Sequence, residues 1–451
     1  MKIAVIGTGY VGLVTGVSLA LLGHNVVCIG REKFKIEKIN KGTSPFYEPG
    51  LDNLLKKVLT QKLLQATNNF QKAVSNSNII IIAVGTPTIG NRIDLSAIKT
   101  ISKQIGKELR NSSKYQVVVV KSTVVPSTTE KIIKPLLEKY SNKKIGEFGL
   151  CMSPEFLREG NAVKDATNPD RIVIGQIDEK SGILFSQAYE DVFCPKVFTN
   201  LTTAEMTKYA ANSLFATLIS YSNEIARICE SIKDIDVVDV WKGVHLDSRL
   251  SSNTLREGQV PGIVHYIFSG CGYGGSCFPK DTKALLAYAK SIGVETPIIK
   301  GVIDVNSAQP ERMVDILKKT LGNLKNKKIG ILGLTFKAQT DDLRGSASIS
   351  VIKSLIGQGA KVFCHDPSFD LAGDKRELYG LKINICKTID ETLRSSDGAL
   401  LMTAWEEYTK IMPSLFKKLM KTPVLVDGRR IYSARTFLKA GVIYRGIGYS
   451  G

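Results

Sequence analysis

The chain opens with Met1-Lys2-Ile3-Ala4-Val5-Ile6-Gly7-Thr8-Gly9-Tyr10-Val11-Gly12, a short apolar run that ends in closely spaced glycines. The apolar residues 3–6 predict a buried strand, and residues 13–22 predict the helix after it. A GxGxxG pattern between a strand and a helix is typical of a dinucleotide-binding turn, because its glycines let the pyrophosphate approach the helix N-terminus. We therefore predict cofactor contacts from Gly7, Gly9, Tyr10, Val11 and Gly12; a plain strand–helix turn is the alternative.

Apolar runs alternate with helical segments in two parts of the chain. Buried parallel strands are predicted at residues 3–6, 26–29, 79–84, 117–120 and 171–174, and again at 328–332, 361–365, 398–402 and 423–426. Between the two parts, a segment from Thr202 to about Ser231 has no Gly or Pro and predicts one long helix, capped by Thr202 or Thr203. The pattern indicates an α/β fold: two Rossmann-like doubly wound sheet domains, residues 1–200 and 326–451, joined by a central helical connector, residues 201–325.

Composition narrows the class of protein. The eight cysteines form no CxxC pair, so we expect neither a disulfide framework nor a metal site. No apolar run is long enough for a bilayer or a signal peptide, which favours a cytoplasmic protein without a membrane partner. The net charge of +19 would suit nucleic acid, but the lysines are spread along the chain and no nucleic-acid motif accompanies them. We predict instead a basic surface that attracts an anionic substrate such as a nucleotide.

The second predicted strand ends in Ile29-Gly30-Arg31-Glu32, where a dinucleotide site usually carries an acidic residue for the ribose hydroxyls. A carboxylate there repels a 2′-phosphate, whereas glycine followed by Arg31 would accept one. The sequence therefore predicts that NADP serves at least as well as NAD. Two alternatives remain: Glu32 replaces the missing acid, or Arg31 stacks on the adenine.

One cysteine lies in the glycine-rich stretch Gly272-Tyr273-Gly274-Gly275-Ser276-Cys277-Phe278-Pro279-Lys280-Asp281. A thiol near cationic groups can act as a nucleophile, although a buried structural cysteine is the commoner case. Lys208 and Asn212 lie four residues apart on the long helix, so both face one side and could stabilise an oxyanion or simply be solvated. Other polar groups follow strands, where a doubly wound sheet binds ligands: Thr86-Pro87, Lys121-Ser122-Thr123, Ser153-Pro154-Glu155 and Phe336-Lys337.

Together these segments resemble the UDP-glucose/GDP-mannose dehydrogenase family. The resemblance runs from Met1 to about Gly448. Beyond the segments already quoted, it includes Phe46-Tyr47-Glu48-Pro49-Gly50-Leu51, Pro154-Glu155-Phe156-Leu157-Arg158-Glu159-Gly160, Asn168-Pro169-Asp170-Arg171, Thr340-Asp341-Asp342, Trp405, Val426-Asp427-Gly428-Arg429 and Tyr444-Arg445-Gly446-Ile447-Gly448. It implies two successive NAD(P)-dependent oxidations at C6 of a nucleotide sugar, with UDP-glucose favoured over GDP-mannose. It also implies an NAD(P)-binding domain at residues 1–200, a dimerisation domain at 201–325 and a UDP-sugar-binding domain at 326–451, in a homodimer or larger homo-oligomer.

The resemblance also implies roles for individual residues. Cys277 matches the nucleophile that holds the substrate as a thiohemiacetal and then a thioester, Lys208 and Asn212 match the oxyanion stabilisers, and Glu155 matches the residue that assists hydrolysis. Asp281, through a bound water with Thr123, matches part of the proton relay. Further cofactor contacts are expected from Arg31, Thr86, Pro87, Thr123, Glu159, Lys280 and Arg344. Substrate contacts are expected from Phe156, Leu157, Arg158, Lys208, Asn212, Arg249, Tyr266, Gly270, Phe278, Phe336 and Lys337, with Arg249 reaching the site of a partner subunit.

The chain departs from many relatives in four places: Gly30-Arg31, Leu218 in place of a basic residue, Ser127 in place of a glycine, and a longer segment between Arg249 and Tyr266. Two other classes of function remain alternatives. One is a single-oxidation dehydrogenase of the 6-phosphogluconate type, which Cys277 and the second sheet domain oppose. The other is a non-catalytic nucleotide-sugar-binding or nucleic-acid-binding protein, which the joint presence of Cys277, Lys208, Asn212 and Glu155 opposes.

Overall fold

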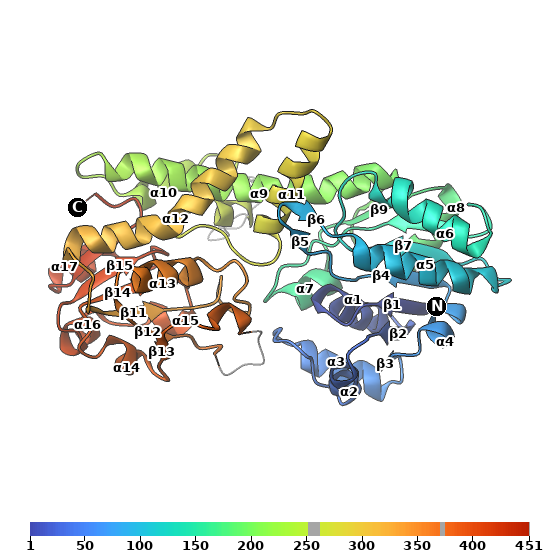
Figure 1. The fold of residues 1–451 in the computed structure, drawn as a ribbon, viewed down its shortest axis with the longest axis horizontal. Coiled ribbons are helices and arrows are strands. Elements are labelled where there is room, and N and C mark those ends of the chain that lie inside the picture. Colours follow the sequence, from blue (N-terminus) through green and yellow to red (C-terminus); the bar gives the residue numbers. More distant parts are fainter. Residues whose placement is uncertain (251–261, 370–374, 451) are drawn as a thin grey trace. The chain divides into compact units, whose positions relative to one another are not determined.

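The computed structural model describes residues 1–250, 262–369 and 375–450, and the chain forms two compact units, Met1–Ala211 and Asn212–Gly451 (Figure 1). The longer segment between Arg249 and Tyr266 is therefore only partly described, since residues 251–261 lie outside these ranges. None of the helices in the described ranges is long and apolar enough to cross a membrane. The predicted division into three domains stays a prediction.

The first unit contains a sheet of eight strands in the order β10-β9-β8-β7-β4-β1-β2-β3. From β3 to β8 the strands are parallel and follow the 3-2-1-4-5-6 order of dinucleotide-binding folds. The sheet strands are β1 (Lys2–Ile6), β2 (Asn25–Ile29), β3 (Leu64–Thr67), β4 (Ile79–Ile82), β7 (Val117–Val120), β8 (Gly149–Met152), β9 (Ile172–Gln176) and β10 (Lys196–Thr199); β5 (Thr88–Ile89) and β6 (Arg92–Ile93) form a hairpin.

Helices of the first unit pack on both faces of this sheet. They are α1 (Tyr10–Leu21), α2 (Lys33–Asn40), α3 (Leu51–Thr60), α4 (Phe70–Ser75), α5 (Ser96–Arg110), α6 (Lys134–Ser141), α7 (Ala162–Thr167) and α8 (Glu179–Ser186), with a π-helical turn η1 (Thr129–Ile133) and a 3-10 turn η2 (Gln187–Tyr189). Along β1, Ile3 and Val5 join the core under α1 and α3, whereas Ala4 and Ile6 join the core under α5. Two buried faces explain why the strands are continuous apolar runs instead of alternating ones.

The helix α9 (Leu201–Glu230) is the longest of the described chain and confirms the predicted long helix (Figure 1, green). Its predicted cap by Thr202 or Thr203 is wrong, because the side chain of Asn200 accepts the backbone N–H of Thr203 at 2.8 Å. Asparagine is the stronger N-cap residue, and here it lies one position before the first helical residue.

The second unit holds a six-stranded parallel sheet in the order β13-β12-β11-β14-β15-β16, again the 3-2-1-4-5-6 order. Its strands are β11 (Lys328–Leu332), β12 (Lys361–His365), β13 (Ile383–Ile385), β14 (Gly398–Leu401), β15 (Val424–Asp427) and β16 (Ile443–Gly446). Its helices, after the C-terminal part of α9, are α10 (Val237–His245), α11 (Phe278–Ser291), α12 (Pro297–Leu321), α13 (Ala347–Gly357), α14 (Ile389–Leu393), α15 (Glu406–Thr409), α16 (Pro413–Leu419) and α17 (Ala434–Lys439); η3 (Gly262–Tyr266) and η4 (Arg376–Leu378) are 3-10 turns.

Asp366 directly follows β12, at the strand end where a dinucleotide fold would place its ribose-binding acid. This carboxylate is buried and accepts the backbone N–H groups of Leu334 at 2.6 Å, Thr335 at 3.0 Å and Ser368 at 2.9 Å. It also accepts the indole N–H of Trp405 at 3.3 Å. Asp366 therefore braces the loop after β11 from inside the second unit.

Each predicted strand is present in the structure, but one of them, β9, runs in a direction that was not predicted. β9 was predicted as part of a parallel series, but it runs antiparallel to β8 and parallel only to β10. A parallel pair needs a connection that crosses back to the end of the sheet where the first strand began. Residues 153–171 hold only the short helix α7, and the chain re-enters the sheet at the end where β8 leaves it.

Candidate active site

The glycine-rich turn between β1 and α1 is packed tightly at two glycines and open at the third. A Cβ on Gly7, whose φ is +124°, would lie 2.3 Å from the carbonyl oxygen of Ala83, and one on Gly12 would lie 2.1 Å from that of Gly7. A Cβ on Gly9, the N-cap residue of α1, would meet no atom within 4 Å. The turn thus leaves open space at the N-terminus of a twelve-residue helix, which fits a pyrophosphate.

Glu48 connects this turn to the segment that carries Glu159. Its carboxylate accepts the hydroxyl of Tyr10 and the backbone N–H groups of Gly160 and Ala162, both at 2.7 Å. Burial, together with the hydrogen bond to Glu48, raises the pKa of Tyr10 far above its ordinary value. The segment around Glu48 is part of the resemblance, but the sequence predicted no role for this residue, because its backbone partners lie more than a hundred positions away.

The end of β2 carries no carboxylate at position 30. A Cβ on Gly30 would lie 2.8 Å from the hydroxyl oxygen of Thr8, so a side chain there requires Thr8 to move. Glu32 is the N-cap residue of α2 and pairs with Lys35 at 2.6 Å. Arg31 is exposed beside them.

The ends of β4 and β7 come together at the same edge of the sheet, as predicted for Thr86, Pro87 and Thr123. The hydroxyl of Thr86 donates to the carbonyl oxygen of Thr123 at 2.7 Å, and that of Ser122 to Val84 at 2.7 Å. The proposed water bridge from Thr123 to Asp281 joins residues of the two units and stays a prediction.

Glu155 and Lys208 form a buried ion pair in the first unit. The Lys208 ammonium lies 3.0 Å from the Glu155 carboxylate and donates to the Glu155 carbonyl oxygen at 2.7 Å, and the two side chains are only 3% and 7% exposed. The carboxylate also accepts the backbone N–H of Leu157 at 2.7 Å. Burial alone would raise the pKa of Glu155, but the charge and hydrogen bond of Lys208, with help from Leu157 and Lys121, hold it below its ordinary value.

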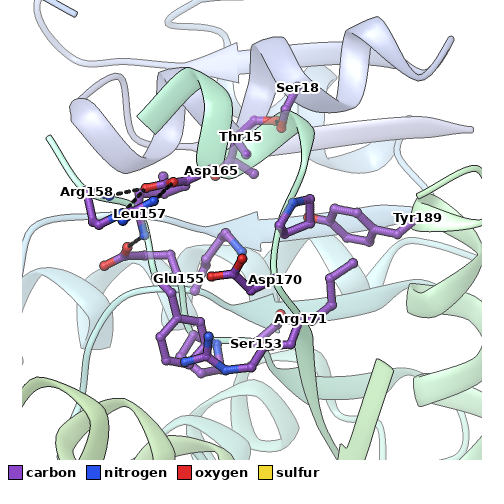
Figure 2. Close-up of a pocket in the computed structure, with 16 residues that line it drawn as sticks. Thr15, Ser18, Ser153, Glu155, Leu157, Arg158, Asp165, Asp170, Arg171 and Tyr189 are labelled. Atoms are coloured by element: carbon purple, nitrogen blue, oxygen red, sulfur yellow. Dashed lines mark hydrogen bonds and ion pairs between the residues drawn. The ribbon is translucent and has the colours of Figure 1, made fainter. Parts of the chain in front are cut away.

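A pocket of about 80 Å³ lies beside Glu155. Thr15 and Ser18 of α1 lie on one side of it, and Ser153 and Arg171 on the other (Figure 2). Lys121, which follows β7 and is 9% exposed, also lines the pocket. Burial lowers the pKa of Lys121 to about 8, although the negative charge of Glu155 opposes the shift.

Arg158 and Phe156, both predicted to contact substrate, have partners within the first unit. The Arg158 guanidinium pairs with Asp165 at 2.6 Å (Figure 2). The Phe156 ring lies 3.8 Å from the Arg171 guanidinium and 5.4 Å from the Lys208 ammonium. These contacts fix the segment after β8 that also carries Leu157 and Glu159.

In the second unit, Cys277 is the N-cap residue of α11 and is partly buried. The position places its sulfur where the helix dipole favours negative charge. The turn before it is close-packed: Gly275 has a φ of +82°, a Cβ on it would lie 2.9 Å from the Phe336 ring, and its N–H donates to Arg344 at 2.9 Å. The turn that precedes Cys277 thus packs against two other predicted residues, Phe336 and Arg344.

Asp281 lies one turn into α11 and is 1% exposed. It accepts the side-chain amide of Asn212 at 2.6 Å and pairs with Lys280, while its own backbone N–H donates to Cys277 at 2.8 Å. Asn212 is thereby fixed in the second unit, one turn along α9 from Lys208. Three predicted residues, Asn212, Lys280 and Asp281, form one contact group next to the cysteine.

The remaining predicted residues of the second unit fall into two groups. Tyr266 and Phe278 stack with Phe215, with ring centroids 4.3 Å apart for Phe215 and Tyr266, and the Gly270 N–H donates to Asn223 at 2.7 Å. The second group is charged. Arg249 is exposed and pairs with Asp247, and Arg344 is exposed and pairs with Asp342. The Lys337 ammonium lies 5.7 Å from the centre of the Phe336 ring. The predicted contact of Arg249 with a partner subunit stays a prediction.

Comparison with known proteins covers the whole chain. Residues 1–193 match the NAD binding domain of the UDP-glucose/GDP-mannose dehydrogenase family, residues 202–308 its central domain, and residues 330–434 its UDP binding domain. UDP-glucose 6-dehydrogenase TuaD of Bacillus subtilis is 39% identical over 448 residues, which are 99% of this chain and 93% of that protein.

Solved structures show the same likeness. A UDP-glucose dehydrogenase from Pyrobaculum islandicum superposes with a TM-score of 0.89 at 34% identity, over 99% of this chain and 97% of the other. GDP-mannose dehydrogenase from Pseudomonas aeruginosa has a TM-score of 0.55 at 33% identity, over 100% of both chains.

Proposed function

The chain belongs to the UDP-glucose/GDP-mannose dehydrogenase family, and we propose that it is a UDP-glucose 6-dehydrogenase that oxidises the sugar twice with a nicotinamide cofactor. The observation that carries this proposal is the contact group at the start of α11, where Cys277 caps the helix and Asp281, one turn later, holds Asn212. A nucleophile held on the end of a helix beside a buried acid and an amide suits covalent capture of an aldehyde.

The bound nicotinamide supplies the acceptor for each hydride. The C6 alcohol loses a hydride and a proton and becomes an aldehyde, and the Cys277 sulfur adds to that aldehyde to give a thiohemiacetal. The Asn212 amide and the Lys208 ammonium donate hydrogen bonds to the oxygen that becomes negatively charged. The thiohemiacetal loses the second hydride to become a thioester, and Glu155 assists the attack of water that releases the acid and the thiol.

The capture step is tested by Cys277→Ala, with Cys386→Ala as the matched control, since Cys386 is the other partly buried cysteine of the second unit. We expect Cys277→Ala to abolish formation of UDP-glucuronate and Cys386→Ala to leave it unchanged. Normal acid production by Cys277→Ala would contradict the covalent role. UDP-glucose, GDP-mannose and UDP-N-acetyl sugars, each offered with NAD⁺ and NADP⁺, decide the substrate; faster turnover of GDP-mannose would favour the alternative.

The NAD binding domain supports NAD(H) as cofactor, and we propose that NADP⁺ serves at least as well. The support is the absence of a carboxylate at Gly30, the pairing of Glu32 with Lys35, and the exposed Arg31. A charge-assisted hydrogen bond contributes about 1.5–3 kcal/mol, so Arg31→Ala should lower kcat/KM for NADP⁺ by roughly 10- to 100-fold and change that for NAD⁺ little. Lys57→Ala on α3 is the control for loss of an exposed cation.

Two kinetic results would contradict the NADP⁺ proposal. One is a large preference of the wild-type protein for NAD⁺. The other is a selective loss of NAD⁺ use in Glu32→Gln, which would make Glu32 the acid that holds the ribose.

We also propose a homodimer formed through α9. Leu214, Tyr221 and Ile228 are each more than half exposed and follow one another at intervals of seven residues, two helical turns, so they form one apolar stripe. Tyr221→Glu should shift the mass measured by sedimentation velocity to that of a monomer, whereas Gln104→Glu on α5 should not. A monomeric wild-type protein would contradict the proposal. A cytoplasmic location stays a prediction.

A further inference from the structure

The acid-forming half of the proposed reaction consumes one water molecule for each sugar. This water must meet the thioester carbon, and its protons must leave. Glu155 assists the attack, but it is already engaged by Lys208 and by the N–H of Leu157. A second group beside Glu155 would help to hold the water in place, and the pocket next to it is lined by polar and charged groups.

The pocket has the size and polarity to hold water. A cavity needs roughly 10–15 Å³ to hold one water, so about 80 Å³ accommodates several. Its lining includes Glu155, Lys121 and Ser153, which provide charged and hydroxyl groups. Ordered water in proteins needs two to four such partners.

Lys121 and Glu155 are the buried charged residues of the lining, and of these two only the Glu155 side chain has a partner in the described part of the protein. The strand pairing sets its place: Val120 and Met152 are partners in the ladder and the Ser153 N–H donates to Val120 at 2.9 Å, so Lys121 lies next to the start of the Glu155 segment. Its side chain is 9% exposed, and its ammonium makes no hydrogen bond or ion pair with any described residue. A buried ammonium with three donors must bind water, and the pocket is where that water fits.

We propose that Lys121 holds, in this pocket, the water that hydrolyses the thioester, and is thus a positioning residue for the acid-forming step. The inference rests on the proposed function. The water oxygen bonds to C6, and the C6–S bond breaks with its electron pair going to the Cys277 sulfur, which leaves as a thiolate. Of the two water protons, one passes to Glu155 and the other is released from the new carboxylic acid through the pocket water.

The test separates hydrolysis from the two oxidations. In Lys121→Met, we expect the first turnover to release two equivalents of reduced cofactor at close to the wild-type rate, followed by a steady-state rate at least tenfold lower. The UDP-glucuronyl thioester should then accumulate on Cys277 and appear as an added mass on intact protein. Hydroxylamine, which cleaves thioesters without ordered water, should restore turnover, and Lys121→Arg, which keeps the charge, should recover part of the rate.

Lys107→Met, which removes an exposed lysine of α5, is the control and should behave as wild type. An unchanged steady-state rate in Lys121→Met would overturn the inference. So would a slower first turnover without accumulated thioester, since that result would mean that Lys121 only maintains the structure. Wild-type protein that oxidises UDP-glucose only once, or not at all, would instead overturn the proposed function, and this inference with it.

Discussion

The Lys208→Met substitution should destabilise the first unit through the carboxylate that it leaves behind. The Lys208 ammonium is 3% exposed and 3.0 Å from the Glu155 carboxylate, itself 7% exposed. Removing one partner of a buried pair costs about 3–5 kcal/mol, because the other charge stays buried without compensation. Lys121 still acts on Glu155, so we expect the lower end, about 3 kcal/mol. With a urea m-value of roughly 1–3 kcal/mol/M, the midpoint should fall by about 1–3 M.

The cost should depend on pH with a definite sign. In the wild-type protein the pKa of Glu155 lies below its ordinary value, so the pair stabilises the fold above the unfolded pKa and the effect is lost as pH falls through the folded pKa. Without Lys208, burial dominates and raises the pKa of Glu155, so the folded variant binds a proton that the unfolded chain does not. The difference from wild type should therefore be larger at pH 8 than at pH 5.

Two optical signals separate the units in this experiment. Trp241 and Trp405 are the only tryptophans of the chain and both lie in the second unit, so their fluorescence follows that unit, whereas far-ultraviolet circular dichroism follows both. The double variant Lys208→Met/Glu155→Leu should recover most of the loss, because no buried charge remains. Lys107→Met is the control. A midpoint within 0.3 M of wild type, or a double variant as unstable as the single one, would refute the reasoning.

Three further predictions concern other parts of the structure. Burial raises the pKa of Glu205 to about 7, so its contribution to stability is present at low pH and lost as pH rises through 7. In the wild-type protein this should lower the free energy of unfolding, measured by urea titration, by about 2–3 kcal/mol between pH 5 and 8. Glu205→Gln should remove this pH dependence, and a retained slope would count against the assignment. Gly275→Ala, at a φ of +82°, should lower the free energy of unfolding, followed by tryptophan fluorescence, by about 1–3 kcal/mol. Gly301→Ala should be neutral or stabilising, because a Cβ at this position of α12 would meet no atom within 4 Å. Iodoacetamide at pH 7.5 should label Cys277 before Cys28, whose pKa burial raises to about 12; equal labelling by peptide mass mapping would argue against the burial pattern.

The strands that the sequence predicted are mostly buried on both faces, although β8, which is also wholly buried, was not predicted. β1, β4, β7, β11 and β15 are wholly or almost wholly buried, and continuous apolar runs mark them. β10 and β13 lie at sheet edges with mostly exposed or half-exposed side chains, so their composition gives no such signal. Direction is a different matter: the antiparallel run of β9 depends on where the connection returns, which a strand's own residues do not encode.

The candidate site divides in the same way. Cys277, Glu155, Lys208 and Asn212 stand out because their residue types carry chemistry, and the resemblance supplied their roles. Glu48 acts through backbone N–H groups more than a hundred residues away, and no local pattern reveals such a partner. Lys121 was noted only as part of a loop after a strand; its importance emerges from the pocket and from the hydrogen bonds it lacks.

Asp366 has a consequence for how many cofactor molecules each chain can take up. The second sheet repeats the strand order of the first, and the acid at the end of β12 stands where a ribose would be held. Its oxygens are already occupied by Leu334, Thr335, Ser368 and Trp405, so architecture is duplicated without duplication of the site. Calorimetric titration should therefore saturate at one dinucleotide per polypeptide, and the second sheet is left to serve the other half of the substrate pair.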